Sequence, residues 1–242
     1  MSSSITGSRS QPIRTARARA HAEVRGEIIA TARAHLAVAG ASGLSLRAVA
    51  RELGMVSSAV YRYVASRDEL LTALIVEAYD SLGQRAEDAV ARTAGSPPLD
   101  RWIEAARAIR GWATERPHEY ALLYGTPVPG YAAPPDTVAP GTRVSIALVA
   151  VVRDAASAGL LRRHAADAAR PASSATHEAL ARLREVTELE AGDDVVFDVL
   201  LAWTQLFGLL SFELFGQTRG LVEDHAAFFD DAAVAMASRI GL

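Results

Sequence analysis

The chain has 242 residues, half of them apolar, with a net charge of −3 and no cysteine. This length allows one large domain or a small domain joined to a larger one, and the apolar share is enough for a sizeable core. The lack of cysteine excludes disulfides, thiolate catalysis and cysteine-ligated zinc. Residues 1–27 are rich in Ser and Arg and lack the apolar segment of a secretion signal, so we expect a cytoplasmic protein.

Positive charge is concentrated at the start of the chain. Residues 1–66 carry nine arginines against three acidic residues, whereas the remainder carries 16 arginines against 25 acidic residues. A basic N-terminal region on an acidic remainder is typical of a protein that contacts nucleic acid at one end.

Residues 1–21 show no apolar period, which predicts a disordered basic arm. Two interpretations of this arm stay open. Its arginines either reach DNA phosphates or a minor groove, or they belong to a solvated tail. The arginines in question are Arg9, Arg14, Arg17 and Arg19. A helix is expected over residues 22–39, where apolar residues recur at helical spacing before Gly40.

The stretch from Gly43 to Leu71 predicts two short helices, a tight turn and the start of a third helix. Ser45 is expected to cap the first helix through its hydroxyl, and Gly54 is expected to end it. Ser57 or Ser58 is expected to cap the second helix. Two helices joined by a short turn containing Gly form the DNA-binding helix-turn-helix, whose second helix enters the major groove.

The third helix has its own start signal, Ser66 as N-cap with Glu69 as its capping-box partner. The run LSLRAVARELGMVSSAVYRYVASRDELL resembles the DNA-binding domain of TetR-family transcriptional regulators. It has a Ser before the first helix, Ala-x-x-Leu-Gly, a Tyr-x-Tyr pair and a Ser-Arg-Asp-x-Leu entry to the next helix. The resemblance implies an all-α fold, with a helix-turn-helix domain over residues 22–66 and an effector-binding and dimerisation domain over residues 67–242. The alternative is a three-helix packing module without a role in DNA binding.

The resemblance also implies which side chains contact DNA. Base edges are expected to meet Arg47, Ser57, Ser58 and Arg62. Phosphates are expected to meet Ser45, Tyr61, Tyr63 and Arg67. Each of these residues can alternatively serve in capping or packing. Tyr63 stands where many relatives have His, so the base preference of the family cannot be carried over.

Only helices are predicted after this region. They are expected over residues 67–92, 99–115, 118–124, 141–158, 176–189, 193–215 and 223–240. Residues 125–140 contain five prolines, which predict a stiff loop, and residues 159–175 resemble a loose connection.

The helix over residues 193–215 is apolar on nearly all sides, and Asp198, Gln205 and Glu213 argue against a membrane span. Its own bundle can cover one face and a second copy of the chain the other, so we expect a homodimer. The expected interface residues are Val199, Trp203, Leu206, Phe207, Leu210, Phe228 and Met236.

A ligand pocket in the larger domain is inferred, and polar or aromatic residues are the candidates to line it. These are Trp102, Trp112, His118, Tyr120, Tyr124, Tyr131 and Trp203; the alternative for each is ordinary core packing. The segment HEYALLYGTPVPGYAAP and the later Trp-x-x-x-Phe-Gly resemble a TetR subgroup with a Trp–hydrophobic–Gly signature. These motifs name no ligand.

Catalytic and metal-binding motifs are not evident, and no cofactor is expected. His164 with Asp167, and His177 with Glu178, lack a third ligand at metal spacing. We interpret the chain as a homodimeric repressor that binds a palindromic operator and is released by a small-molecule effector. The alternatives are a ligand-independent regulator or an activator and, remotely, a helical small-molecule-binding protein or enzyme.

Overall fold

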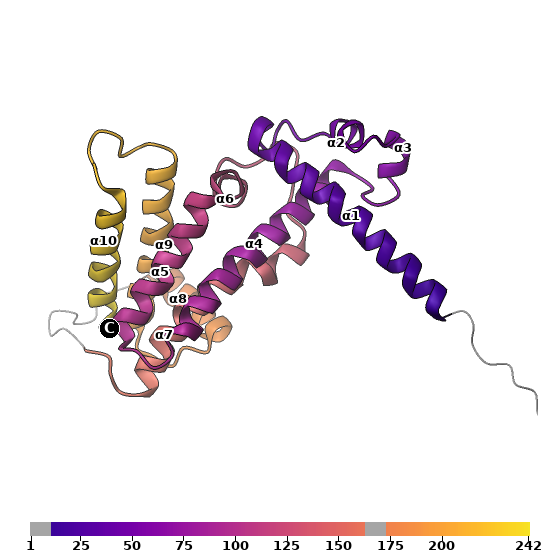
Figure 1. The fold of residues 1–242 in the computed structure, drawn as a ribbon. Helices are drawn as coiled ribbons and strands as arrows, with labels where there is room; N and C mark the ends of the chain where they lie inside the picture. The colour runs from indigo at the N-terminus through magenta and orange to yellow at the C-terminus, as the bar shows by residue number, and fades with distance from the viewer. Residues whose placement is uncertain (1–10, 163–172) are drawn as a thin grey trace, which may run out of the picture. The chain divides into compact units, whose positions relative to one another are not determined.

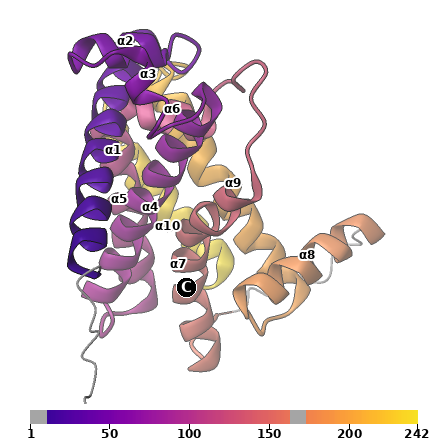
Figure 2. The same cartoon turned by 90° about the vertical axis from the view of Figure 1, so that its right-hand side faces the viewer.

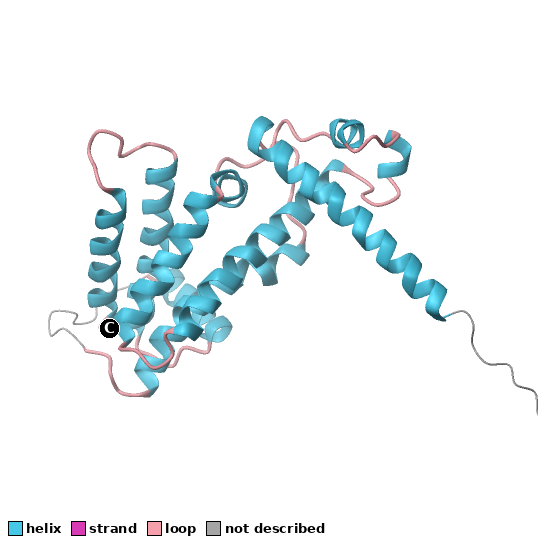
Figure 3. Cartoon of the chain, in the orientation of Figure 1, coloured by secondary structure: helices cyan, strands magenta, loops and turns pink. Residues whose placement is uncertain are grey.

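The computed structural model describes residues 11–162 and 173–242, and within these ranges all regular structure is helical (Figures 1 and 3). The predicted all-α class is therefore confirmed. The chain forms two compact units. The first contains the residues up to Ile75 together with Thr126–Ala133, and the second contains Val76–Gly125 and Pro134–Leu242. The proline-rich segment Thr126–Ala133 thus belongs to the first unit, whereas the sequence analysis placed it in the larger domain.

The first unit contains α1 (Gln11–Ala39), α2 (Leu46–Glu52), α3 (Ser57–Val60) and the start of α4 (Arg67–Arg92). Residues 11–21 are helical, so the prediction that they form a disordered arm is wrong. Ala and Arg, which are frequent here, are both strong helix formers. Arg9 lies outside the described residues, and so does the side chain of Arg14.

The helix-turn-helix has the predicted order of elements but different caps. Ser45 precedes α2 without a capping bond from its hydroxyl, and Val56 precedes α3, so neither Ser57 nor Ser58 is a cap. Gly54, with φ +65°, follows α2 as predicted. Hydrogen-bonded turns follow α3: the Val64 amide donates to the Val60 carbonyl at 3.1 Å, the i to i−4 pattern of a helix.

The start of α4 is tied down by three side chains. Ser66 Oγ accepts a bond of 3.0 Å from the Glu69 amide, which confirms the predicted N-cap, and Glu69 Oε2 accepts one of 2.7 Å from the Ala65 amide. Arg67 reaches back along the chain: its Nη2 donates to the Ala41 carbonyl at 2.8 Å and its Nε to the Leu44 carbonyl at 3.2 Å. This arginine therefore fastens the α1–α2 turn to the first turn of α4.

The second unit contains the remainder of α4 and a bundle of further helices (Figure 2). They are α5 (Pro98–Glu115), α6 (Pro117–Tyr124), the 3₁₀ turn η1 (Pro135–Thr137), α7 (Val138–Ser157), α8 (Ser174–Thr187), α9 (Asp193–Leu214) and α10 (His225–Ile240). Helix α5 packs against α7, α9 and α10, and α8 packs against α7 and α9.

Helix α9 is long and apolar enough to cross a membrane by length and composition, a test that core helices of soluble proteins also pass. Buried Asp198 and partly buried Glu213 on this helix are both paired inside the unit. Arg239 Nε donates to Asp198 Oδ1 at 2.6 Å, and Arg110 binds both carboxylate oxygens of Glu213 at 2.9 and 2.6 Å. Bidentate pairing of this kind fixes geometry as well as charge. These pairs assign α9 to the bundle core.

We expect Arg67→Ala to loosen the helix-turn-helix. Hydrogen bonds from a charged donor contribute about 1.5–3 kcal/mol each, and partial exposure of the guanidinium reduces this. Amide hydrogen exchange in residues 41–44 and in α2 should accelerate roughly tenfold. Arg62→Ala, which alters an exposed arginine of the same unit, is the matched control. Unchanged exchange in Arg67→Ala would contradict this assignment.

Candidate nucleic-acid interface and ligand cavity

Five of the eight predicted DNA-contact residues lie exposed on α2, on α3 or in the turn after it. They are Arg47, Ser57, Ser58, Tyr61 and Arg62. Tyr61 is 46% exposed, a large aromatic residue with about half of its surface open to solvent. Behind this surface Val49, Val60 and Val64 are fully buried and fix the two helices. The unit therefore presents two donor-rich, exposed helical segments on a packed base.

The other three predicted contacts have structural roles. Two donor nitrogens of Arg67 bond backbone carbonyls, which gives this group a structural role; its contact with a phosphate stays a prediction. Tyr63 is half-buried and its ring lies 4.6 Å from that of His21 on α1. Ser45 is half-buried, and its carbonyl accepts the first hydrogen bonds of α2.

Further arginines extend the exposed basic surface of the first unit. Arg51 lies four residues after Arg47 on α2, which places both side chains on one helix face. Arg17 and Arg19 are exposed on the first turns of α1. The sequence analysis did not single out Arg51, although its spacing from Arg47 on a short amphipathic helix was a usable signal. This surface can neutralise several phosphates at once.

Tyr131 belongs to the first unit. Its hydroxyl lies 2.9 Å from Thr72 Oγ1 on α4, and Thr72 also donates to the Asp68 carbonyl at 2.9 Å. Its role as a ligand contact stays a prediction. The segment Thr126–Ala133 is held to the start of α4.

The second unit forms a half-open apolar cavity of about 300 Å³ between α5, α7, α8 and α9. Two of the predicted ligand residues, Trp102 and Trp203, lie in its wall. Most of the remaining wall is aliphatic and comes from α7 and α8, including Val149, Leu183 and Val186. The sequence analysis named none of these, because aliphatic residues at helical spacing are indistinguishable from ordinary core.

The other predicted ligand residues lie elsewhere in the second unit. Trp112 is buried and donates to Ser81 Oγ at 3.0 Å, and buried Tyr120 donates to the Phe207 carbonyl at 2.9 Å. His118 is exposed. The Tyr124 ring lies 4.5 Å from that of Phe207 and 5.1 Å from that of Tyr120. Burial raises the pKa of Tyr124, and it raises the pKa of Tyr120 to about 12, so both stay neutral phenols at physiological pH.

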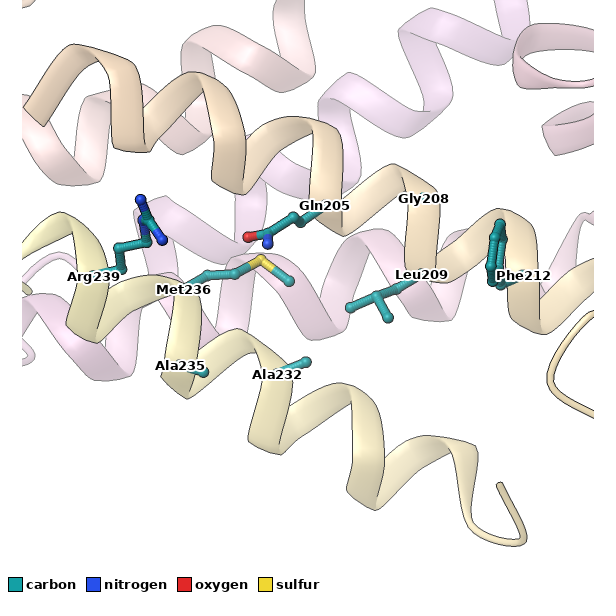
Figure 4. Close-up of a pocket in the computed structure, with 8 residues that line it drawn as sticks. All are labelled: Gln205, Gly208, Leu209, Phe212, Ala232, Ala235, Met236 and Arg239. Atoms are coloured by element: carbon teal, nitrogen blue, oxygen red, sulfur yellow. The ribbon is translucent and has the colours of Figure 1, made fainter. Parts of the chain in front are cut away.

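A groove of about 530 Å³ runs between α9 and α10 (Figure 4). Figure 4 shows Leu209 pointing from α9 toward α10 near Ala232, with Phe212 further along α9 and Ala235 further along α10. Phe212 is 56% exposed, an unusual position for a phenylalanine. The groove is therefore mainly apolar, with Gln205 and Arg239 as its polar side chains and Met236 as the long apolar side chain of the α10 wall.

Most of the predicted dimer residues do not reach this surface. The buried ones, which belong to the core of a single chain, are Val199, Leu206, Phe207, Leu210 and Met236. Phe228 is 46% exposed and Trp203 is partly buried in the cavity wall. An all-round apolar helix gives no sign of which face its own bundle covers, so the interface residues stay a prediction. Met236 still contributes to the groove wall despite its burial.

His177 takes part in an ion-pair cluster. Its Nδ1 lies 2.8 Å from Asp193 Oδ2, and Arg184 pairs with the other carboxylate oxygen. Arg184 first, and His177 second, lower the pKa of Asp193. Across residues 11–162 and 173–242, no group of three or more His, Asp or Glu side chains is arranged to hold a metal ion. His164 and Asp167 lie outside the described residues.

Comparison with known proteins covers both units. A sequence model of the bacterial regulatory proteins of the tetR family matches residues 28–74, and a model of the tetracyclin repressor-like C-terminal domain matches residues 102–236. The HTH-type transcriptional regulator Rv1816 of Mycobacterium tuberculosis is 42% identical over 215 residues, which cover 87% of this chain and 89% of that protein.

Solved structures with a similar fold include regulatory proteins. The crystal structure of the regulatory protein SCO4313 aligns with a TM-score of 0.71 at 35% identity, covering 91% of this chain and 98% of that one. The regulator PfmR from Thermus thermophilus aligns with a TM-score of 0.55 at 16% identity, over 88% of this chain and 96% of that one, and supports the fold alone. The proteins of this family are regulators rather than enzymes. With its helix-turn-helix unit, its helical second unit and these relatives, the chain belongs to the TetR family of helix-turn-helix transcriptional regulators.

Proposed function

We propose that this regulator is a cytoplasmic homodimeric repressor that binds a palindromic operator and leaves it when a small molecule binds the second unit. The DNA-binding part of this proposal rests on the exposed hydrogen-bond donors on α2, on α3 and in the turn that follows α3. Arg47 can bond a guanine edge through two parallel hydrogen bonds, and Ser58 and Tyr61 are available for phosphates or bases. Two copies would place two such surfaces on half-sites about one DNA turn, ~34–36 Å, apart.

Gly208 supports pairing through α9 and α10. It is exposed in the middle of α9, where glycine costs about 0.5–1 kcal/mol relative to alanine. A Cβ built at this position meets no atom within 4 Å, so packing inside one chain gives no reason for glycine here. Close approach of a helix from a second copy would give that reason. Exposed Phe212 beside it would supply apolar area to the same contact.

Chain connectivity supports communication between the two units. The chain passes between them three times, at Ile75–Val76, Gly125–Thr126 and Ala133–Pro134. The Tyr131–Thr72 contact ties the returning loop to the first turns of α4. An effector that prefers one conformation of the second unit would therefore act on the helix-turn-helix through α4 and through this loop. Release then follows from the different affinities of the effector for the two states.

The subgroup with a Trp–hydrophobic–Gly signature remains part of this proposal. Its signature residues have distinct positions here: Trp203 lies in the cavity wall, Phe207 in the core and Gly208 on the groove. One short segment of α9 would then serve ligand binding, folding and pairing.

Arg47→Ala should weaken binding to the DNA upstream of the regulator's own gene by at least tenfold. Removing a bidentate bond to a guanine costs about 1–3 kcal/mol, and the exposed side chain can be truncated without disturbing the core. Fluorescence anisotropy with a labelled duplex measures the effect. Arg219→Ala, an exposed arginine of the second unit, should bind as the wild type does. Wild-type affinity in Arg47→Ala would refute the proposed base contact.

Gly208→Glu should convert the dimer to a monomer while leaving the helix content unchanged. The new side chain has free space in one chain and favours a helix, but it would be buried and charged between two chains. Sedimentation equilibrium gives the oligomeric state, and circular dichroism gives the helix content. Gly111→Glu in α5, where a Cβ also meets nothing within 4 Å, should remain dimeric. A dimeric Gly208→Glu protein would exclude this face as the interface.

A further inference from the structure

Val56 is an exposed valine at the entry to α3. It immediately precedes the first residue of that helix, and 70% of its surface is open to solvent. Its backbone is extended, with φ −69° and ψ 139°, and its carbonyl accepts a bond of 2.8 Å from the Ala59 amide. Ser57 and Ser58, which carry hydroxyls and are both exposed, follow directly. Val56 therefore adds an apolar group to a surface of hydrogen-bond donors.

The stability of α3 gives no reason for a valine at this position. Val56 is the N-cap residue, and the side chains favoured at an N-cap accept a hydrogen bond from an amide of the first turn. Ser66 does this for α4 in the same unit, through the 3.0 Å bond from the Glu69 amide. Valine is among the least favoured residues at an N-cap, because its side chain has no acceptor. A serine in its place would stabilise the helix.

The core of the first unit gives no reason for this valine either. Val49, Val60 and Val64 are fully buried and supply that core, whereas Val56 faces solvent. Exposure alone carries little weight, because single exposed apolar residues are common on protein surfaces. Val38 is even more exposed, at 91%, but it lies in the last turn of α1. Val56 differs from it in position, because the N-terminal residues of a recognition helix contact base edges.

Thymine is the base that offers an apolar partner in the major groove. The edges of the four base pairs present hydrogen-bond donors and acceptors there, and thymine also presents its C5-methyl group. Contact between this methyl group and a valine removes apolar surface of both from water, which is favourable. A purely polar base edge would lose water at the valine without gaining a hydrogen bond, which is unfavourable.

We propose that Val56 reads one thymine in each half of the operator, through contact between its methyl groups and the C5-methyl group of the base. This inference rests on the proposed function, because it adds a specificity-determining residue to the same DNA-binding surface. Val56 would select the base by apolar contact, while the donors of Ser57 and Ser58 bond base edges or phosphates beside it.

Replacement of thymine by uracil tests the contact from the side of the DNA. Uracil lacks only the C5-methyl group, so base pairing and the hydrogen-bonding edge are kept. The full-length protein first selects a duplex from a random-sequence library, and each thymine of the selected duplex is then replaced in turn. Fluorescence anisotropy should show roughly fourfold weaker binding when the contacted thymine of one half-site is replaced, and roughly fifteenfold weaker binding when both are. These factors correspond to the loss of one buried methyl group per half-site.

Val56→Ser tests the contact from the side of the protein and separates it from folding. The variant gains a capping side chain, so its melting temperature should be at least that of the wild type. Its affinity for the thymine duplex should fall by a factor similar to that of the double uracil replacement, and uracil at the contacted positions should then have no further effect. Val38→Ser removes an exposed valine of α1 and should keep both the affinity and the uracil sensitivity of the wild type.

Three results would overturn the inference. They are a selected duplex in which no thymine is sensitive to uracil, a uracil effect that persists at every sensitive thymine in Val56→Ser, and a lower melting temperature of Val56→Ser, which would assign Val56 to packing. In each case the selected duplex shows that the regulator still binds a specific site. If the library yields no preferred duplex, the proposed function fails and this inference fails with it.

Discussion

The guanidinium of Arg67 is the contact on which the DNA-binding unit depends. By donating to the carbonyls of Ala41, Ser42 and Leu44, it closes the α1–α2 turn onto the first turn of α4. The cap formed by Ser66 and Glu69 fixes that same turn. Helices α2 and α3 are too short to be stable alone, so their arrangement comes from this fastening and from the apolar core beneath them. The positions of the exposed hydrogen-bond donors on α2 and α3 therefore depend on the bonds of Arg67 and on this core.

Helix α9 is the element of the second unit on which its core, its cavity and its groove all depend. One side of it carries buried Leu206 and Leu210 together with Trp203, which lines the cavity, and the opposite side exposes Gly208 and Phe212 in the groove. Ion pairs of Asp198 and Glu213 satisfy the charges that such a helix would otherwise bury alone. Ligand occupancy at Trp203 and pairing at Gly208 would thus act on one rigid element, five residues apart. In the proposed dimer, this proximity would give an effector a direct route to the interface.

The sequence predicted what depends on local chemistry. The helix-turn-helix, the Ser66 cap and the order of the helices follow from capping residues, glycine positions and apolar spacing, and the structure agrees. It did not predict what depends on tertiary placement. An arginine at the start of a helix is a residue type that commonly binds phosphate, and only the fold shows that the carbonyl of Ala41 lies within hydrogen-bond distance of Arg67. The same holds for the burial of Val199 inside one chain, because apolar spacing says that a face is covered but not by which element. Sequence order likewise did not reveal that the loop with Tyr131 returns to the first unit.

The salt dependence of operator binding by Arg67→Ala tests the central role of this arginine most directly. Removing one phosphate-binding cation from a DNA complex reduces the slope of log K against log salt by about 0.9, so removing two per dimer would reduce it by about 1.8. If Arg67 is a structural residue, the variant binds operator more weakly than the wild type but with an unchanged slope. A slope shallower by about 1.8 would show that the guanidinium binds phosphate and would contradict this account.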